Sequence, residues 1–168
     1  VSTAFRPDKA VLIDSENYTA YLDKLGEAAG LEIGNYGQLK EALKKRIDYF
    51  HKMGCRLCDH GLNSMSFETF SDQEIEQIFS KKRNGENLSA LEVEKFKTAI
   101  LLFLCETYHE KGWVQQFHLG ALRNNNKRML SRLGPDTGRD SIGDFSQTQS
   151  LSNFLNELDG KDKLAKTI

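Results

Sequence analysis

The feature that most constrains the fold is a pair of short apolar runs separated by a long helical stretch. The runs CRLCD (55–59) and WVQQF (113–117) have the length and composition of buried strands. Between them, two Ser-x-x-Glu capping boxes predict helices over 72–83 and 89–111. A tight hairpin joins antiparallel strands, whereas parallel strands need a long crossover connection that usually contains a helix. The helices between these two runs therefore predict parallel strands.

Apolar residues at helical spacing predict three more helices. They span 14–29 (capped by Asp14 or Ser15), 36–53 and 150–158. Gly30 is a suitable stop for the first, since glycine adopts the left-handed conformation that often ends a helix. The run AILLFLC (99–105) is apolar all round, which predicts a deeply buried segment of the helix over 89–111.

The segment STAF (2–5) is a third strand candidate, which should end before Pro7 because proline lacks a backbone donor. Residues 124–149 are polar and rich in glycine and predict a long loop. The pattern therefore predicts an α/β fold with about three parallel strands. Three strands alone would leave sheet edges uncovered, so we expect part of a larger sheet or barrel. The missing initiator Met and the abrupt tail, GKDKLAKTI, fit a piece of a longer protein.

Composition and charge exclude several classes of function. The formal net charge is −1, so no overall field attracts nucleic acid or an anionic membrane. No apolar run is long enough to span a bilayer, and no signal peptide is visible. The odd count of three cysteines fits a reducing cytoplasm. We interpret Cys55 and Cys58, formally a CxxC pair, as structural because they lie in a strand-like run. GxGxxG and GxxxxGK[ST] motifs are absent, and the acidic spacing over 136–144 does not fit a calcium loop.

Ionisable residues follow each of the three strand candidates, at Arg6, Asp59, His60, His118 and Arg123. The carboxyl ends of parallel strands meet at one face of an α/β fold, so these side chains should converge there. His118 is the best candidate for a functional role, since it precedes Gly120, which permits close backbone approach. We expect Arg6 to bind a substrate carboxylate through its fork of donors.

Each of these residues also has a purely structural interpretation. Arg6 could pair with Asp8 on the surface, and Asp59 with His60 could form a hydrogen-bonded pair at the strand end. Arg123 and the asparagines over 124–126 could belong to a solvated loop. These alternatives stay open at the level of sequence.

Four stretches resemble uronate isomerase, also called glucuronate isomerase, of the amidohydrolase-like barrel superfamily. They are FRPDK (5–9), DHG (59–61), FHLGALRNNN (117–126) and RLGPDTGRDSIGD (132–144). The resemblance implies part of a distorted (β/α)₈ TIM-type barrel, spanning 1–168, with an inserted helical region over 62–112 between two barrel strands. It also implies an aldose–ketose isomerase that converts D-glucuronate to D-fructuronate and D-galacturonate to D-tagaturonate in carbohydrate metabolism.

The same resemblance suggests roles for individual residues. Arg6 matches an arginine expected to bind the anionic substrate, and His118 matches a histidine expected to face the sugar and the reacting oxygens. Asp59, His60 and Arg123 take substrate-binding or supporting roles. A divalent metal, usually zinc, is expected in the full-length enzyme, with ligands outside this chain. The expected partners are a hexuronate and the remainder of the same barrel, with a homo-oligomer left open and neither nucleic acid nor membrane.

A different class of function is also compatible with the sequence. The run RNNNKR (123–128) could be a basic patch on a non-catalytic helical module that binds protein or RNA. Asp136, Asp140 and Asp144 follow closely and argue against RNA. On the isomerase interpretation, the isolated chain should be inactive.

Overall fold

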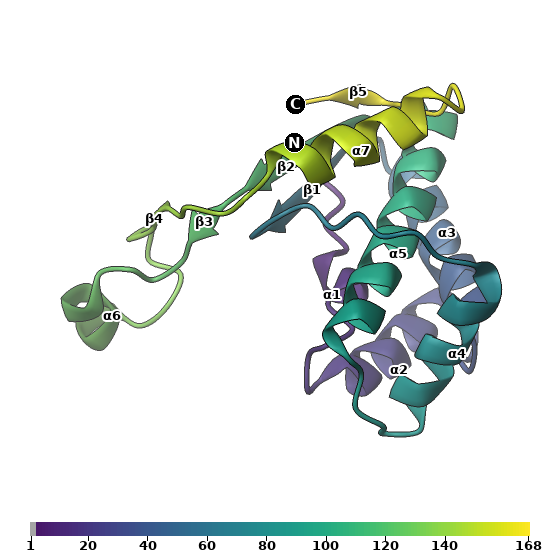
Figure 1. Cartoon of the computed structure of the whole chain (residues 1–168), viewed down its shortest axis with the longest axis horizontal. Helices are drawn as coiled ribbons and strands as arrows, with labels where there is room; N and C mark the ends of the chain where they lie inside the picture. The colour runs from purple at the N-terminus through teal and green to yellow at the C-terminus, as the bar shows by residue number, and fades with distance from the viewer. Residues whose placement is uncertain (1–2) are drawn as a thin grey trace.

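The computed structural model describes residues 3–168 and shows a small parallel sheet with helices packed on one face (Figure 1). The helices are α1 (Asp8–Val11), α2 (Tyr18–Ala29), α3 (Tyr36–Lys52), α4 (Asp72–Arg83), α5 (Ala90–Glu110), α6 (Lys127–Leu133) and α7 (Thr148–Asp159). The strands are β1 (Leu57–Leu62), β2 (Val114–Leu119), β3 (Ala121–Leu122), β4 (Ser141–Ile142) and β5 (Lys166–Thr167).

The central sheet has the strand order β1-β2-β5, and both pairings are parallel. Gly61 of β1 lies opposite His118 of β2, and His60 lies opposite Phe117. Phe5 adds an isolated parallel bridge to Cys58 on the outer side of β1. The prediction of an α/β fold with parallel strands is therefore confirmed, with helices α4 and α5 in the connection from β1 to β2.

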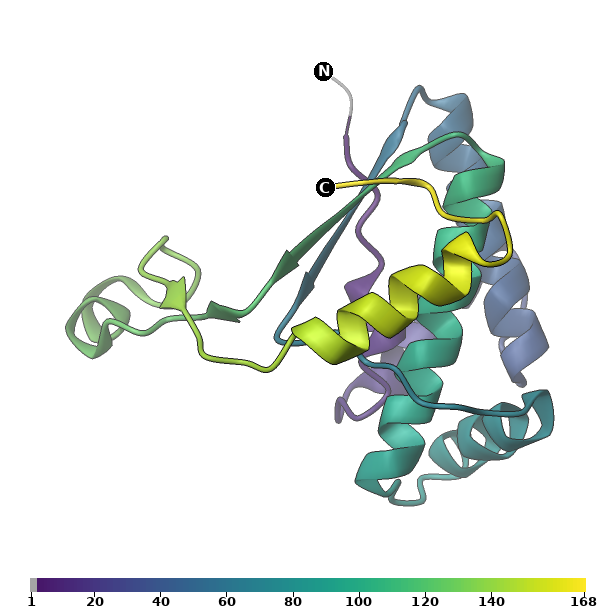
Figure 2. The ribbon, with the colours of Figure 1, turned by 45° about the horizontal axis from the view of Figure 1, so that its top comes forward.

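The two faces of the sheet differ because successive side chains along a strand alternate. Cys58, His60 and Phe117 point to the face that α5 and α7 cover; Phe117 packs edge-on against Phe154 of α7. Figure 2 shows α7 packed beside α5. Asp59 and His118 point to the opposite face, which the described residues leave open.

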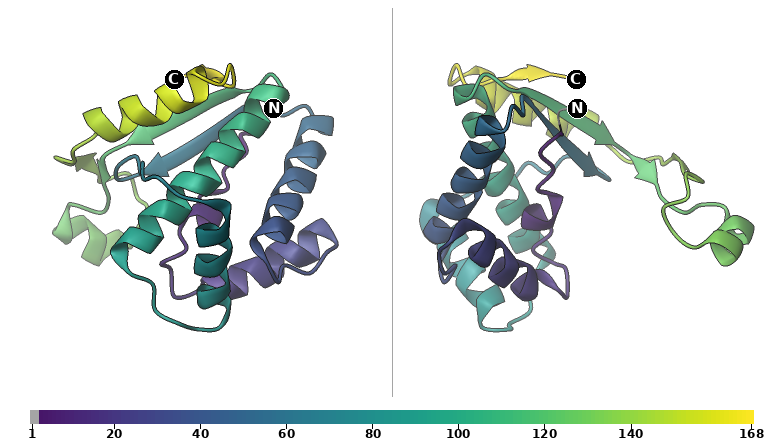
Figure 3. Two further views of the ribbon diagram at one scale, coloured as in Figure 1. Left: turned by 45° about the vertical axis from the view of Figure 1, so that its right-hand side comes forward. Right: turned by 180° about the vertical axis from the view of Figure 1, so that it is seen from behind.

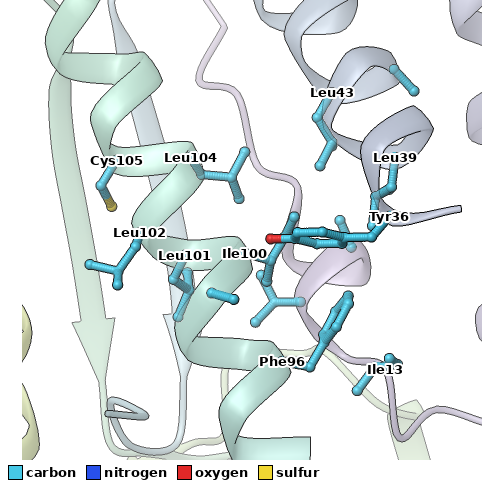
Figure 4. Packing of buried hydrophobic residues seen from close by; sticks show 14 of the residues in the cluster. Ile13, Tyr36, Leu39, Leu43, Phe96, Ile100, Leu101, Leu102, Leu104 and Cys105 are labelled. Atoms are coloured by element: carbon cyan, nitrogen blue, oxygen red, sulfur yellow. The ribbon is translucent and has the colours of Figure 1, made fainter. Parts of the chain in front are cut away.

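The core lies between α5 and the helices around it (Figure 4). Residues 99–105 are buried except for a partly buried Phe103, which confirms the expectation from their apolar run. Tyr36 of α3 packs edge-on against Phe96 of α5. Both predicted capping boxes are present: Ser71 and Ser89 each accept a hydrogen bond from the backbone N–H three residues later, and α4 begins as predicted.

An arm formed by β3, α6 and β4 extends away from this body, beyond the carboxyl ends of β1 and β2 (Figure 3). β3 and β4 pair antiparallel, with Ala121 opposite Ile142. No residue of α6 is buried. The prediction of a continuous loop over 124–149 was wrong, because α6 and β4 lie within it. The side chain of Asn126 caps α6 by accepting from the backbone of Met129.

The strand boundaries also differ from those predicted. The run 55–59 becomes Leu57–Leu62 and the run 113–117 becomes Val114–Leu119, so His60 and His118 lie inside strands rather than after them. The polar residues in the second half of each strand were not predicted to be extended, because the prediction relied on apolar composition. Their extended conformation depends on the hydrogen-bonded pairing of β1 with β2. The strand expected over 2–5 is reduced to the bridge at Phe5, and Ser2 lies outside the described residues.

The start of helix α2 and the tail of the chain also differ from the sequence interpretation. Helix α2 begins after Asn17, not at Asp14 or Ser15, because residues 12–18 form consecutive turns. Gly30 ends this helix in the left-handed conformation, as predicted. The tail contributes β5, whose pairing with β2 supplies the third strand of the sheet.

Candidate functional site

Three side chains from distant parts of the sequence meet on the open face of the sheet, within and beside its strands. Arg6 follows the bridge at Phe5, Asp59 lies on β1 and His118 lies on β2. Nη2 of Arg6 is 3.4 Å from Nε2 of His118, and Nη1 of Arg6 is 3.3 Å from Oδ2 of Asp59. The expected convergence of Arg6 and His118 is therefore present.

The contacts of His118 determine which of its ring nitrogens carries the hydrogen. Nε2 faces two guanidinium groups, Nη2 of Arg6 at 3.4 Å and Nη2 of Arg123 at 3.2 Å. Guanidinium nitrogens only donate hydrogen bonds, so Nε2 accepts and Nδ1 carries the hydrogen. Nδ1 is 2.8 Å from Oδ1 of Asp59, which accepts it. His118 thus presents an unprotonated nitrogen on the open face, next to two cations.

Arg6 is clamped on its other side by Asp8. Its Nε donates to Oδ2 of Asp8 at 2.8 Å, and this hydrogen bond raises the pKa of Arg6. The pair with Asp8 that the sequence suggested is therefore present, together with the contacts of Arg6 to Asp59 and His118. Clamping Nε leaves the two terminal nitrogens of the guanidinium as the edge that can bind a carboxylate in a bidentate way.

Gly61 makes room for this arrangement. It lies opposite His118 in the β1–β2 ladder. A Cβ atom at this position would overlap the guanidinium of Arg6 and the imidazole of His118. The side chains of Arg6 and His118 thus occupy the space that a side chain at position 61 would fill.

Arg123 comes from the start of the arm and is held by Asp140 at its far end. Nη1 of Arg123 donates to Oδ2 of Asp140 at 2.7 Å, and the backbone N–H of Asn124 donates to Oδ1 at 2.8 Å. The bond from Asn124, followed by that from Arg123, lowers the pKa of Asp140. Arg123 therefore forms a defined ion pair and approaches His118, rather than lying free in a solvated loop.

The three successive asparagines also have local roles in the arm. Asn124 adopts a left-handed backbone, with φ 55°, and its side chain accepts from the backbone of Asp136. Asn125 donates to the hydroxyl of Ser141, and Asn126 caps α6. They shape the arm that carries Arg123, and we find no direct contact between them and His118 in the described part of the chain.

His60 is the one candidate that the structure separates from the others. Its side chain is fully buried on the helix-covered face, where Nδ1 is 3.1 Å from Asp8 and Nε2 is 3.3 Å from the hydroxyl of Tyr108. Asp59 and His60 therefore point to opposite faces and do not form the hydrogen-bonded pair that the sequence suggested. Burial would raise the pKa of Asp8, but hydrogen bonds from His60, Arg6 and the backbone of Gly61 together lower it.

The sequence did not indicate that Asp8 contacts Arg6, His60 and Gly61 at once. It also did not indicate that Gly61, Tyr108 and Asp140 contribute to the site. Asp8 and Gly61 stand inside the quoted motifs FRPDK and DHG, which was the only available signal for them. Tyr108 carries no such signal, because it belongs to a long apolar helix and meets His60 only through the fold.

Other chemistry has less structural support within the described residues. The three cysteines are free and buried, and burial raises the pKa of Cys58 to about 12, which does not suit a nucleophilic thiol. Among residues 3–168, no three His, Cys, Asp or Glu side chains are grouped so that they could hold a metal ion. No described helix combines the length and apolar character needed to cross a membrane.

Comparisons with known proteins agree on one family. The family model described as glucuronate isomerase matches residues 1–168. Curated relatives named uronate isomerase include one from Flavobacterium johnsoniae, 59% identical over all of this chain, and one from Geobacillus thermodenitrificans, 46% identical. The chain spans 36% of the length of each of these relatives.

Solved structures give the same result for the fold. The crystal structure of uronate isomerase from Thermotoga maritima superposes with a TM-score of 0.84 at 32% identity, over 96% of this chain and 36% of that one. Glucuronate isomerase from Caulobacter crescentus superposes with a TM-score of 0.76 at 26% identity, over 93% of this chain and 32% of that one.

Proposed function

Because this chain belongs to the glucuronate isomerase family, we propose that it supplies part of the active site of an enzyme that interconverts aldose and ketose forms of hexuronates. The substrates would be D-glucuronate with D-fructuronate and D-galacturonate with D-tagaturonate. The observation that carries this proposal is the convergence of Arg6 and Arg123 on Nε2 of His118. Two guanidinium groups suit a carboxylate, and an accepting nitrogen between them suits a hydroxyl of the same small molecule.

The proposed chemistry needs no oxidant. One hydrogen moves from C2 to C1 of the sugar and one hydroxyl hydrogen moves from O2 to O1, through an enediol. In the proposal, the carboxylate of the substrate replaces His118 as the partner of Nη2 of Arg6 and of Nη2 of Arg123. The exposed Nε2 then takes the hydroxyl hydrogen from O2 and returns it to O1, while Asp59 keeps the hydrogen on Nδ1 and fixes the ring. The group that carries the hydrogen from C2 to C1 would come from a segment outside this chain.

We propose that the parallel sheet continues into a distorted (β/α)₈ barrel outside this chain, with residues 62–112 as an inserted helical region. The polar site lies on the sheet face opposite α5 and α7, at the carboxyl ends of the strands, where the active sites of such barrels lie. The remainder of the barrel would then cover the open face.

A divalent metal ion, zinc by resemblance, is proposed for the full-length enzyme. The described residues do not fit a metal site, so its ligands would come from other segments and no step above depends on them. Two arginines, Arg6 and Arg123, face three carboxylates, Asp8, Asp59 and Asp140, so the formal charge of these five groups is −1. A further cation near the site would therefore favour an anionic substrate. We also propose a cytoplasmic location, which the free cysteines support.

Kinetics of a full-length enzyme that contains this segment test the proposed function. We expect His118→Ala to lower kcat by at least about 10²-fold without unfolding the protein. Arg6→Lys should mainly raise KM, since a lysine cannot serve Asp8 and a carboxylate in the same planar geometry. His109→Ala, in the last turn of α5 and without a hydrogen bond to Arg6 or His118 among the described residues, is the matched control and should behave as wild type. Normal turnover in His118→Ala would remove this residue from the mechanism, and a normal KM in Arg6→Lys would reduce Arg6 to a surface pair with Asp8.

A further inference from the structure

A buried chain of hydrogen bonds leads from the helical core to Arg6. The hydroxyl of Tyr108 on α5 is 3.3 Å from Nε2 of His60, and Nδ1 of His60 is 3.1 Å from Oδ1 of Asp8. Oδ2 of Asp8 then accepts from Nε of Arg6 at 2.8 Å. Tyr108 and His60 are both fully buried, whereas Arg6 lies on the open face.

The hydrogens in this chain can be assigned from its ends. The ionised carboxylate of Asp8 only accepts, so Nδ1 of His60 donates to it. Nε2 of a neutral His60 then accepts from the hydroxyl of Tyr108. Each group has the partner it needs, which matters because an unpaired polar group at a buried position is costly.

Asp8 has little freedom to turn within this network. One of its oxygens faces His60, and the other accepts from both Arg6 and the backbone N–H of Gly61, at 3.1 Å. If His60 were lost, the first oxygen would lack its buried donor and the carboxylate could rotate. The guanidinium of Arg6 would then lose the fixed direction that places its terminal nitrogens at Asp59 and His118.

His60 is itself held on more than one side. Its ring stacks on Phe117, its partner across the ladder, at 5.6 Å between centroids and 24° between planes. The ring of Tyr108 lies 5.9 Å away on the α5 side. Packing therefore fixes the ring, and the hydrogen bond from Tyr108 fixes which nitrogen faces Asp8.

We propose that His60, anchored by Tyr108, is a positioning residue that fixes the direction of the Arg6 guanidinium through Asp8. This inference rests on the proposed function, because it assigns the buried network to the substrate-binding group of the same site. It gives the helical core a defined influence on substrate binding. His60 itself touches no substrate and is not a catalytic residue.

A double-mutant cycle in a full-length enzyme tests this inference. Tyr108→Phe removes one hydroxyl, and His60→Asn keeps a donor near Asp8 but loses the ring and the link to Tyr108. We expect each to raise KM for the hexuronate roughly five- to tenfold, with a smaller change in kcat. In an Arg6→Lys background, the same changes should raise KM less than about twofold, because their effect passes through Arg6.

The matched control is Thr107→Val on the same helix. Thr107 is buried, and its hydroxyl donates to the backbone of Phe103 at 2.8 Å, without any described link to the site. It should lower the melting temperature about as much as Tyr108→Phe while leaving KM unchanged. Additive effects of His60→Asn and Arg6→Lys on KM, or an equal rise of KM in Thr107→Val, would overturn the positioning role.

Crystal structures of full-length Tyr108→Phe and His60→Asn give a readout that does not depend on activity. We expect the guanidinium of Arg6 to leave its position beside Asp59 and His118 in both. An unmoved Arg6 would refute the inference whether or not the enzyme turns over. Failure of wild-type enzyme to isomerise any hexuronate would instead refute the proposed function alone, so the two failures can be distinguished.

Discussion

Three carboxylates hold the three side chains of the candidate site that would face the ligand. Asp8 holds Arg6, Asp59 holds His118 and Asp140 holds Arg123. Arginine side chains lose much rotational freedom when they bind a ligand, and a second hydrogen-bond partner removes part of that freedom in advance. Such preorganisation explains why the site needs acidic residues although its proposed ligand is an anion.

Gly61→Ala tests how closely the site residues approach β1. The three atoms nearest to its Cβ would belong to the side chains of Arg6 and His118, which can move without displacing the backbone. We expect a small loss of stability, but a fall of at least about 10²-fold in kcat/KM, because displacement of site groups by about 1 Å has that scale of effect. Steady-state kinetics and thermal unfolding of the full-length protein measure both.

Gly26→Ala on α2 is the matched control, since its Cβ would lie 2.6 Å from the backbone oxygen of Leu31. Backbone cannot yield as a side chain can, so we expect destabilisation of about 1–3 kcal/mol with kcat/KM unchanged. Full activity in Gly61→Ala would show that Arg6 and His118 do not need the positions described here.

Sequence could indicate Arg6 and His118 because both belong to motifs and follow or end apolar runs. It could not separate Asp59 from His60, whose opposite orientations depend on where the strand begins and ends. It also could not find Tyr108, because contacts between residues far apart in sequence follow from packing rather than from local pattern. Asp140 belongs to a recognised motif, but the sequence does not show that it pairs with Arg123. This pairing depends on the fold of the arm.

At the scale of elements, local signals predicted helices better than strands. Ser71 and Ser89 sit directly before α4 and α5, because a capping box is complete within four residues. A third box, formed by Asn35 and Gln38, starts α3 and was not recognised from sequence. The polar ends of β1 and β2 depend instead on pairing between the strands, which no local window contains.

The capping box of α5 carries a pH-dependent contribution to stability. A hydrogen bond from Lys81, at 2.6 Å, and those from Ser89 lower the pKa of Glu92 from 4.5 to about 2. Glu92→Gln keeps the capping box but loses the charge. Because the folded state holds the ionised form, wild type should be the more stable protein above about pH 4.5, by the small amount typical of a partly exposed ion pair.

The stability difference between wild type and Glu92→Gln should shrink as pH falls from about 4.5 toward 2, where the folded carboxylate gains its proton. Urea unfolding of both full-length proteins between pH 7 and pH 3 measures it. Glu16→Gln, which removes an exposed carboxylate that forms no ion pair among the described residues, is the control for the loss of one negative charge. A difference that grows toward low pH would contradict the assignment.

At the scale of the whole molecule, two kinds of surface indicate that further structure covers this chain. β5 and the segment at Phe5 leave sheet edges without a described partner, and unpaired edges are usually covered in native proteins. The arm exposes large apolar side chains, at Leu122, Leu130, Leu133 and Ile142. The chain spans 36% of the length of its curated relatives, so the remainder of such a protein is large enough to cover both.

Hydrogen exchange can compare the isolated chain with a full-length enzyme. The core helix α5 buries all of residues 99–105 except Phe103 within the described fold itself, so its amides should exchange slowly in both proteins. The amides of α6, which buries no residue here, should exchange quickly in the isolated chain and slowly in the full-length enzyme. We expect no isomerase activity from the isolated chain, because His118 and both arginines would face solvent on an open sheet. Equal exchange of α6 in both proteins would mean that the arm stays exposed in the full-length enzyme. The rest of the barrel would then leave Ile142 uncovered, a side chain that is 94% exposed in this chain.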